Sequence, residues 1–288
     1  MNIRVSYNWL KEYLPGLKAS PEQVAEKLSL HSFSVEKIIR MDEGMDNLVI
    51  GRIEKIEKHP NADKLRVTQT DTEGNGKTRT IVCGGTNLQE GQLVAVALPA
   101  TADRPGARVR WHGAGEPIEL KETEIRGVKS AGMICSASEI GLAQAFPHQE
   151  AEILDLSWTK AKPGTKLAEA LELDDAIMEI EITSNRPDAM GIIGLAREVG
   201  AIFNIKLKIK DKKLKTQIKN SKISGIEVKV EVPKLCPRYI AVLMENIKVG
   251  QSPWWMKRRL IASGVRPINS IVDITNYVLL KILFSSSI

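Results

Sequence analysis

The stretch "KIEKHPNADKLRV", residues 55–67, carries the strongest fold signal in this chain of 288 residues. β-Branched runs flank it on both sides, with "LVIGRIEKI" before it and "KLRVTQTD" after it. Between them, Pro60 fixes φ, and the side chains of Asn61 and Asp63 are suited to local hydrogen bonds in a turn. The pattern therefore predicts a turn between two strands, with several polar groups at one edge of a β-sheet.

The chemistry of this turn is compatible with a metal site, a catalytic base, a nucleic-acid contact or a plain turn. The other histidines, His31, His112 and His148, have no spacing to His59 or to one another that is typical of metal ligands. A general base needs a nucleophile or a bound electrophile nearby, and the sequence places neither there. Two interpretations remain open, a plain structural turn and a loop that holds polar groups for a ligand.

The positive charge of the chain is unevenly distributed. Residues 206–288 contain 17 Lys and Arg against 5 Asp and Glu, whereas residues 1–205 contain 24 against 30. Residues 41–150, which include His59, contain 13 against 16 and are net acidic. The overall net charge of +6 therefore does not predict a basic patch around this turn.

The chain has no sequence feature of a membrane or secreted protein. Its apolar runs are shorter than the roughly 18–20 residues that a membrane span requires, and its N-terminus lacks the apolar core of a signal peptide. Three widely spaced cysteines, Cys83, Cys135 and Cys236, form neither a disulfide framework nor a metal motif. We expect a cytoplasmic protein with no metal site and no membrane partner.

The order of predicted elements indicates an α+β chain of several parts. About five short β-branched segments between residues 48 and 135 predict a small barrel or sandwich. On either side, helix signals such as the capping box at Ser20 and Gln23 accompany alternating strands such as "IMEIEIT", residues 177–183. We expect a discontinuous α/β domain of residues 1–40 and 151–205, a barrel insert of 41–150, a Lys-rich linker of 206–222 and a third unit of 223–288.

Further elements are predicted after the barrel. The last β-branched segment of the barrel region is a strand expected at 117–127. After it, strands are expected at 152–156, 225–232 and 238–247, and helices at 165–173 and 252–264. The last helix, "SPWWMKRRLIASG", has Ser252 as its predicted cap and Pro253 in its first turn. A turn of helix is also expected at "SASEIGL", where Ser136 and Glu139 have capping-box spacing.

A second polar cluster, "IRGVKSAGMICSASE", occupies residues 125–139. Arg126 and Lys129 are suited to contacts with phosphates, and the hydroxyl of Ser130 to hydrogen bonds with phosphate or sugar oxygens. Gly127 permits close approach of the backbone. Cys135 has no His or acidic partner in the sequence and is more typical of a small buried residue.

The two clusters and the segment between them occur in a recognisable order. "HPNADKLRV", "IVCGGTNLQEGQLVAVALP" and "IRGVKSAGMICSASEIGL" together resemble the tRNA-binding OB-fold domain of several aminoacyl-tRNA synthetases and free-standing tRNA-binding proteins. The family's five-stranded barrel agrees with the predicted strands. Loop chemistry and resemblance together predict tRNA contact by Lys58, His59, Asn61, Lys64, Arg66, Arg126, Lys129 and Ser130.

The flanking segments resemble one family within that group. "VSYNWLKEYL" at 5–14, "SNRPD" and "AREV" within 174–202, and residues 236–278 are similar to the N-terminal part of bacterial phenylalanine–tRNA ligase β subunits. The resemblance implies a heterotetramer of two α and two β subunits. In it the α subunit activates phenylalanine with ATP and Mg²⁺ and transfers it to tRNA(Phe). We expect no cofactor in this chain, which would contribute tRNA binding and scaffolding.

The C-terminal segment resembles the start of the family's B3/B4 editing module. The resemblance implies that Asn276, in "TNYV", lines the editing pocket. The family continues with Gly-Gln-Pro-x-His-Ala-Phe-Asp, whereas this chain continues with "LLKILFSSSI", so we expect an incomplete pocket. Two alternatives remain, a non-catalytic tRNA-binding module and a structural insert that binds no RNA. The flanks at 5–14 and 174–202 argue against the first, because free-standing modules lack them.

Overall fold

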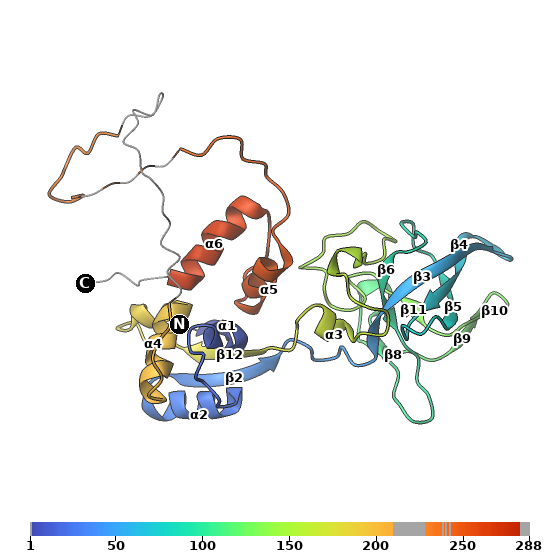
Figure 1. Cartoon of the computed structure of the whole chain (residues 1–288), viewed down its shortest axis with the longest axis horizontal. Helices are drawn as coiled ribbons and strands as arrows, with labels where there is room; N and C mark the ends of the chain where they lie inside the picture. Colours follow the sequence, from blue (N-terminus) through green and yellow to red (C-terminus); the bar gives the residue numbers. More distant parts are fainter. Residues whose placement is uncertain (1, 210–227, 238, 240, 242, 283–288) are drawn as a thin grey trace.

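The structure is a computed structural model that describes residues 2–209, 228–237, 239, 241 and 243–282. It contains two separate β-structures, one at the left of Figure 1 with helices around it and one at the right, with two further helices above the left-hand part. The expected mixed class of helices and sheets is confirmed.

The left-hand sheet joins segments that are far apart in the sequence. β1 (Asn2–Ser6), β12 (Ala176–Glu181) and β2 (Ser34–Arg40) form an antiparallel sheet in the order β1-β12-β2. The alternation predicted for β12 is confirmed, because Met178 and Ile180 are buried while Glu181 is exposed. Strands that precede and follow the β-rich part in the sequence therefore share one core.

Helices α1 (Tyr7–Lys11), α2 (Pro21–His31) and α4 (Ile192–Ile202) contribute to this core, which includes Trp9 and Leu195. The predicted capping box of α2 is present. The Ser20 N–H donates to Gln23 Oε1 over 2.9 Å, and the Gln23 N–H donates to Ser20 Oγ over 3.3 Å.

The turn before α4 is held by an arginine. η3 (Pro187–Met190) follows Arg186, whose guanidinium donates to both carboxylate oxygens of Asp188 and, over 2.8 Å, to Glu198 of α4. These hydrogen bonds lower the pKa of both carboxyl groups. The arrangement is that of a structural clasp between a turn and the helix that follows it.

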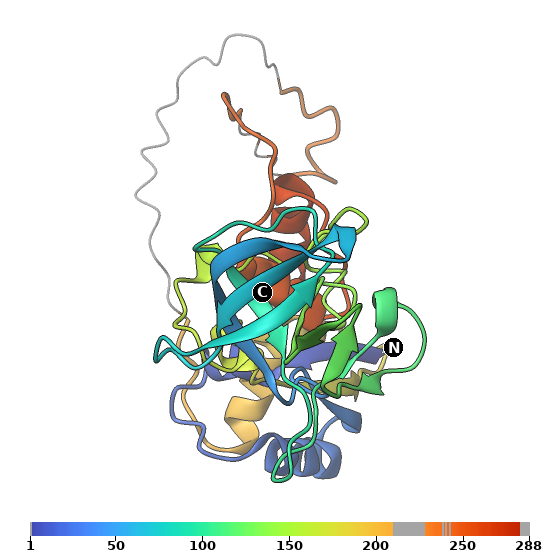
Figure 2. The same ribbon diagram turned by 90° about the vertical axis from the view of Figure 1, so that its right-hand side faces the viewer.

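The right-hand sheet contains five antiparallel strands in the order β11-β6-β3-β4-β5. Figure 2 turns the molecule so that this part faces the viewer. Its strands are β3 (Leu48–His59), β4 (Ala62–Asp71), β5 (Thr78–Cys83), β6 (Leu93–Ala97) and β11 (Met133–Ile134).

Two short hairpins accompany this sheet, β7 (Arg108–Val109) with β8 (Ile118–Glu119), and β9 (Thr123–Ile125) with β10 (Val128–Ser130). The prediction of one continuous strand over 117–127 is wrong. Residues 120–122 separate β8 from β9, and β8 pairs with β7 whereas β9 pairs with β10, so the segment changes its hydrogen-bonding partner there.

Residues 151–173 pack with the five-stranded sheet. The predicted strand at 152–156 is reduced to one isolated bridge between Asp155 and Val94, and the helix expected over 165–173 is only α3 (Leu167–Ala170). Leu156 and Leu171 are fully buried in the core that also includes residues of β3 and β6. Burial of these leucines in the core of the sheet overrides the local helix preference. Similarly, Ser136 and Glu139 exchange the two capping-box hydrogen bonds, but the segment forms turns and no helix.

The chain enters and leaves the right-hand part at one narrow neck. The Met41 N–H, just after β2, donates to the carbonyl oxygen of Asp175, just before β12, over 3.1 Å. The two connecting segments therefore lie side by side, as Figure 1 shows.

Two helices, α5 (Trp254–Ala262) and α6 (Ser270–Ile282), form the last part of the described chain. Strands were expected at 225–232 and 238–247, but none of the described residues in these ranges lies in a strand. A strand needs a hydrogen-bonded neighbour, and apolar residues there such as Val232 and Tyr239 are exposed. Most of the expected linker, residues 210–222, lies outside the described residues.

The predicted capping role of Ser252 is wrong. Pro253 is the N-cap residue of α5, and no side chain caps the helix. Ser252 Oγ instead donates to Oδ2 of Asp273 over 2.5 Å. Asp273 is fully buried in α6 and also accepts the Ile268 N–H, so Ser252 joins the two helices.

Candidate nucleic-acid interface

The turn at residues 59–62 is fastened to a neighbouring hairpin by two side chains. His59 is only 5% exposed, and its Nε2 lies 3.0 Å from the carbonyl oxygen of Ile125. Its Nδ1 accepts the backbone N–H of Asn61 over 3.1 Å. Because an N–H only donates, Nδ1 must be unprotonated, and the ring proton lies on Nε2 and is donated to Ile125. His59 is therefore a brace between β3 and the β9–β10 hairpin.

Asn61 makes the second connection. Its Nδ2 donates to the carbonyl oxygen of Arg126 over 2.9 Å. Arg126 and Gly127 have φ of 48° and 90°, so both central residues of this two-residue turn are left-handed, as a type I′ hairpin turn requires. A Cβ on Gly127 would lie 3.3 Å from Asn61 Nδ2, so the glycine serves both the turn and the close contact.

Two other predicted residues also use their polar atoms inside the fold. Ser130 is 3% exposed; its hydroxyl accepts the Val82 N–H over 3.1 Å and donates to the carbonyl oxygen of Gly132 over 2.8 Å. Arg66 is half-buried, and its Nη1 donates to the carbonyl oxygens of Asp63 and Leu65. RNA contact by His59, Asn61, Arg66 and Ser130 stays a prediction.

The remaining predicted residues are exposed cations around the two fastened turns. Lys58 and Lys64 flank the first turn, and Arg126 and Lys129 belong to the β9–β10 hairpin. Within the described part of the chain, no carboxylate lies within ion-pair distance of these four cations or of Arg66.

The other basic side chains of β3 are paired. Arg52 Nε lies 2.6 Å from Glu54 Oε1, and Lys55 Nζ lies 2.6 Å from Glu57 Oε1. Each of these pairs is neutral, so together they leave the acidic excess of residues 41–150 unchanged. The cations at the rim of the two turns remain available to an anion, although the region as a whole is net acidic.

The cysteines of this part lack the chemistry of nucleophiles. Cys83 and Cys135 are buried. Desolvation raises the pKa of Cys83 to about 11 and the pKa of Cys135 well above its ordinary value. Both thiols are therefore protonated and unreactive near neutral pH. Among the described residues, no cluster of three or more His, Cys, Asp or Glu side chains is arranged to hold a metal ion.

A contact that the sequence did not predict joins α5 to the β-rich part. The indole of Trp254 stacks on Phe146 with ring centroids 5.0 Å apart and donates to the carbonyl oxygen of Leu171 over 2.8 Å. Lys257 is buried, and its Nζ donates to the carbonyl oxygen of Ala145 over 3.1 Å and to Gln251. Burial lowers the pKa of this amine. The hydrogen bonds to Leu171 and Ala145 span 83 and 112 residues of sequence, so no local pattern predicts them.

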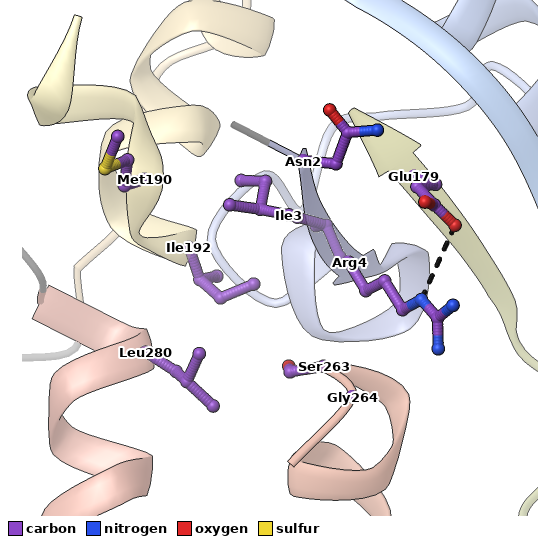
Figure 3. Close-up of a pocket in the computed structure, with 10 residues that line it drawn as sticks. Asn2, Ile3, Arg4, Glu179, Met190, Ile192, Ser263, Gly264 and Leu280 are labelled. Atoms are coloured by element: carbon purple, nitrogen blue, oxygen red, sulfur yellow. Dashed lines mark ion pairs between the residues drawn. The ribbon is translucent and has the colours of Figure 1, made fainter. Parts of the chain in front are cut away.

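Asn276, the residue predicted to line the editing pocket, belongs to α6 and not to the two braced turns. Asn276 is half-buried on α6, beside Tyr277, whose ring stacks on Trp9. An open hollow of about 410 Å³ lies between β1, η3 and the two C-terminal helices. In Figure 3, Arg4 pairs with Glu179 at one side of it, and Leu280 lies at another. Neither Asn276 nor any residue of the two braced turns lines this hollow.

Comparison with known proteins defines a class. The family described as "Putative tRNA binding domain" matches residues 48–166, and the family described as "B3/4 domain" matches residues 235–285. The chain thus contains a segment similar to tRNA-binding domains, followed by a segment similar to B3/4 domains. No helix among the described residues has the length and apolar character to cross a membrane.

Curated relatives define the family more closely. The chain is 40% identical over 281 residues to the phenylalanine–tRNA ligase β subunit of Oceanobacillus iheyensis, covering 96% of this chain and 33% of the relative. It is 40% identical over 282 residues to that of Synechococcus sp. (strain JA-3-3Ab), covering 97% and 32%. It is therefore a homologue of the phenylalanine–tRNA ligase β subunits, and the family resemblance of the sequence is confirmed. The chain spans about a third of the length of these relatives.

A solved structure, the C-terminal domain of Plasmodium vivax p43, aligns with 27% identity over 31% of this chain and 44% of that chain. The TM-score of this alignment is 0.22.

Proposed function

We propose that this chain is the tRNA-contacting and scaffolding part of a phenylalanine–tRNA ligase β subunit. The enzyme attaches phenylalanine to tRNA(Phe) with ATP and Mg²⁺ in the cytoplasm, as a heterotetramer of two α and two β subunits. The aminoacylation chemistry belongs to the α subunit in this proposal. Its main support is the combination of similarity over 96% of the chain with a braced rim of unpaired cations.

The architecture proposed for this role is a discontinuous α/β domain that carries an OB-fold barrel as an insert. Closure of the barrel between β5 and the β10–β11 segment is supported by the Ala131 N–H, which donates to the carbonyl oxygen of Thr80 over 2.9 Å. The sequence predicted an insert of residues 41–150; because residues 151–173 pack with its strands, we extend the proposed insert to 173. The proposed B3/B4 module, with Asn276 in its editing pocket, follows the linker.

The predicted contact residues have two proposed roles. Lys58, Lys64, Arg66, Arg126 and Lys129 contact phosphates, because they are cations without carboxylate partners in the described residues. His59, Asn61 and Ser130 hold the two turns in the geometry that presents these cations. Positioning of a cation on a fixed turn reduces the conformational entropy that is lost when RNA binds.

The affinity of the chain for tRNA, measured over a series of salt concentrations, tests this function. Each neutralised phosphate contributes about 0.7–0.9 to the slope of log K against log salt. Replacement of both Arg126 and Lys129 by alanine should therefore reduce the slope by about 1.4–1.8. The matched control is replacement of Arg52 and Lys55, which removes the same charge but from side chains already paired with glutamates. The control should change the slope much less.

A structural insert that binds no RNA is the competing function, and the net acidic charge of residues 41–150 favours it. A flat, millimolar response to salt would support that alternative and contradict the proposed function. An equal loss of slope in both double variants would mean that the rim of the braced turns is not the contact surface.

A further inference from the structure

An exposed tryptophan lies on a firmly anchored turn between β7 and β8. Trp111 begins the short η1 turn (Trp111–Gly113) and is 55% exposed. Two contacts anchor the turn to residues 138 and 139. The Arg110 N–H donates to the carbonyl oxygen of Glu139 over 2.8 Å, and the backbone packs so closely that a Cβ on Gly113 would lie 2.5 Å from Ser138. The indole is therefore presented to solvent by a fixed backbone. Figure 2 shows this turn at the outer edge of the β-rich part.

Two exposed arginines closely precede the tryptophan in the sequence. In β7 the buried Val109 faces the core, so Arg108 and Arg110 project from the opposite, exposed face and are about 7 Å apart along the strand. Neither has an ion-pair partner among the residues that the structure describes. Arg108 Nη2 makes one hydrogen bond, of 3.4 Å, to the carbonyl oxygen of Pro117.

The local charge differs from that of the surrounding region. Residues 104–115 contain three arginines and no acidic residue, although residues 41–150 are net acidic. Glu119 is the register partner of Arg108, but its Oε1 accepts the Gly106 N–H over 2.8 Å. Asp103 and Glu116 lie just outside the segment and are exposed. The surface around Trp111 is therefore suited to an anionic ligand with a planar group.

We propose that Arg108, Arg110 and Trp111 form a second RNA contact, in which the indole stacks on an unpaired base and the arginines bind the adjacent phosphates. An exposed aromatic ring beside cations is the arrangement that binds single-stranded nucleic acid without reading its sequence. Only residues 120–122 separate the β7–β8 hairpin from β9, whose hairpin carries Arg126, so both contacts belong to consecutive hairpins of the same β-rich part. The choice of RNA as ligand rests on the proposed function.

Replacement of Trp111 by alanine in the 288-residue chain tests the contact, with tRNA(Phe) transcript, a single-stranded oligoadenylate and a fully paired RNA duplex as probes. Loss of one stacked base should weaken binding of the tRNA and the oligoadenylate by about 5- to 150-fold. Binding of the duplex should stay within about threefold, because its bases are not available for stacking. Trp111→Phe, which keeps a stacking face, should restore most of the affinity. Thermal melting verifies that each variant is folded.

The control variant is Trp158→Ala, which removes an indole of similar exposure, 48%, from another part of the surface. It should leave all three affinities unchanged. If the wild-type chain binds tRNA but Trp111→Ala does not weaken binding, the tryptophan contact is excluded while the proposed function stands. Equal losses on duplex and single strand would also overturn stacking. If the wild-type chain binds no RNA, both proposals fall.

Discussion

The side chains of the candidate interface are of two kinds. Some hold the two turns together by hydrogen bonds, and others are exposed to solvent. His59 and Asn61 have the hydrogen-bonding groups of a ligand site, yet both use these groups on backbone atoms of the β9–β10 hairpin. Both residues lie at the rim, where contact residues were predicted, and their proposed role is to position Arg126 and its neighbours.

Asn61→Ala removes the hydrogen bond to the carbonyl oxygen of Arg126 without altering a charge. A hydrogen bond of this kind stabilises by about 0.5–1.5 kcal/mol, so we expect faster amide exchange in residues 123–130 and weaker tRNA binding with an unchanged salt slope. Asn75→Ala, in the β4–β5 turn, is the control for the loss of an exposed turn amide. Unchanged exchange in the hairpin would show that His59 alone provides the brace.

The close contact between the backbones of η3 and α4 limits which residue can occupy position 194. A Cβ on Gly194 of α4 would lie 1.6 Å from the carbonyl oxygen of Asp188 in η3, a distance that no rearrangement of side chains relieves. The clasp of Arg186 with Asp188 and Glu198 holds the same two elements together. The approach of η3 to α4 therefore requires glycine at this position.

Gly194→Ala should lower the free energy of unfolding by about 1–3 kcal/mol or more, because the added methyl group overpacks a rigid contact. Chemical denaturation followed by circular dichroism measures the change. Gly250→Ala is the matched control, since a Cβ there has no neighbour within 4 Å. A similar stability of the two variants would contradict the packing argument.

The sequence predicted those elements whose signals are local. The capping box at Ser20 and the alternation of Met178 and Ile180 depend on neighbours within a few residues, and both are present. Ser252 failed as a cap because the buried Asp273, 21 residues away, takes its hydroxyl. The brace between Asn61 and Arg126 spans 65 residues. The sequence pattern predicts the turn at residues 59–62 and its polar side chains. It does not predict which atoms the Asn61 amide and the His59 imidazole bind.

Helix α5 connects three parts of the molecule, namely the β-rich part, the region of α1 and helix α6. Trp254 and Lys257 bind the β-rich part, Arg259 pairs with Glu12 beside α1 and lies over the ring of Trp9, and Ser252 binds α6. The narrow neck at Met41 and Asp175 alone would permit rotation of the two β-structures. We infer that α5 restrains their relative orientation.

Trp254→Ala should remove this restraint, because it deletes both the stack on Phe146 and the hydrogen bond to Leu171. We expect a broader distance distribution in small-angle X-ray scattering and faster tryptic cleavage near the neck. Trp255→Ala is the control, since Trp255 is 44% exposed and its aromatic contacts are with Tyr277 and Arg259. Identical scattering of Trp254→Ala and the wild type would exclude the restraint.

The neck has a consequence for protein engineering and for gene rearrangement. Because the Met41 N–H and the Asp175 carbonyl oxygen are already hydrogen-bonded, the two cut ends left by excision of the intervening residues would meet without any shift of β2 or β12. A short turn could therefore join them, and the excised segment could be grafted into a hairpin of an unrelated protein. The hydrogen bond between Met41 and Asp175 keeps the two ends of residues 42–174 close together. We therefore expect this segment to be transferable as a unit.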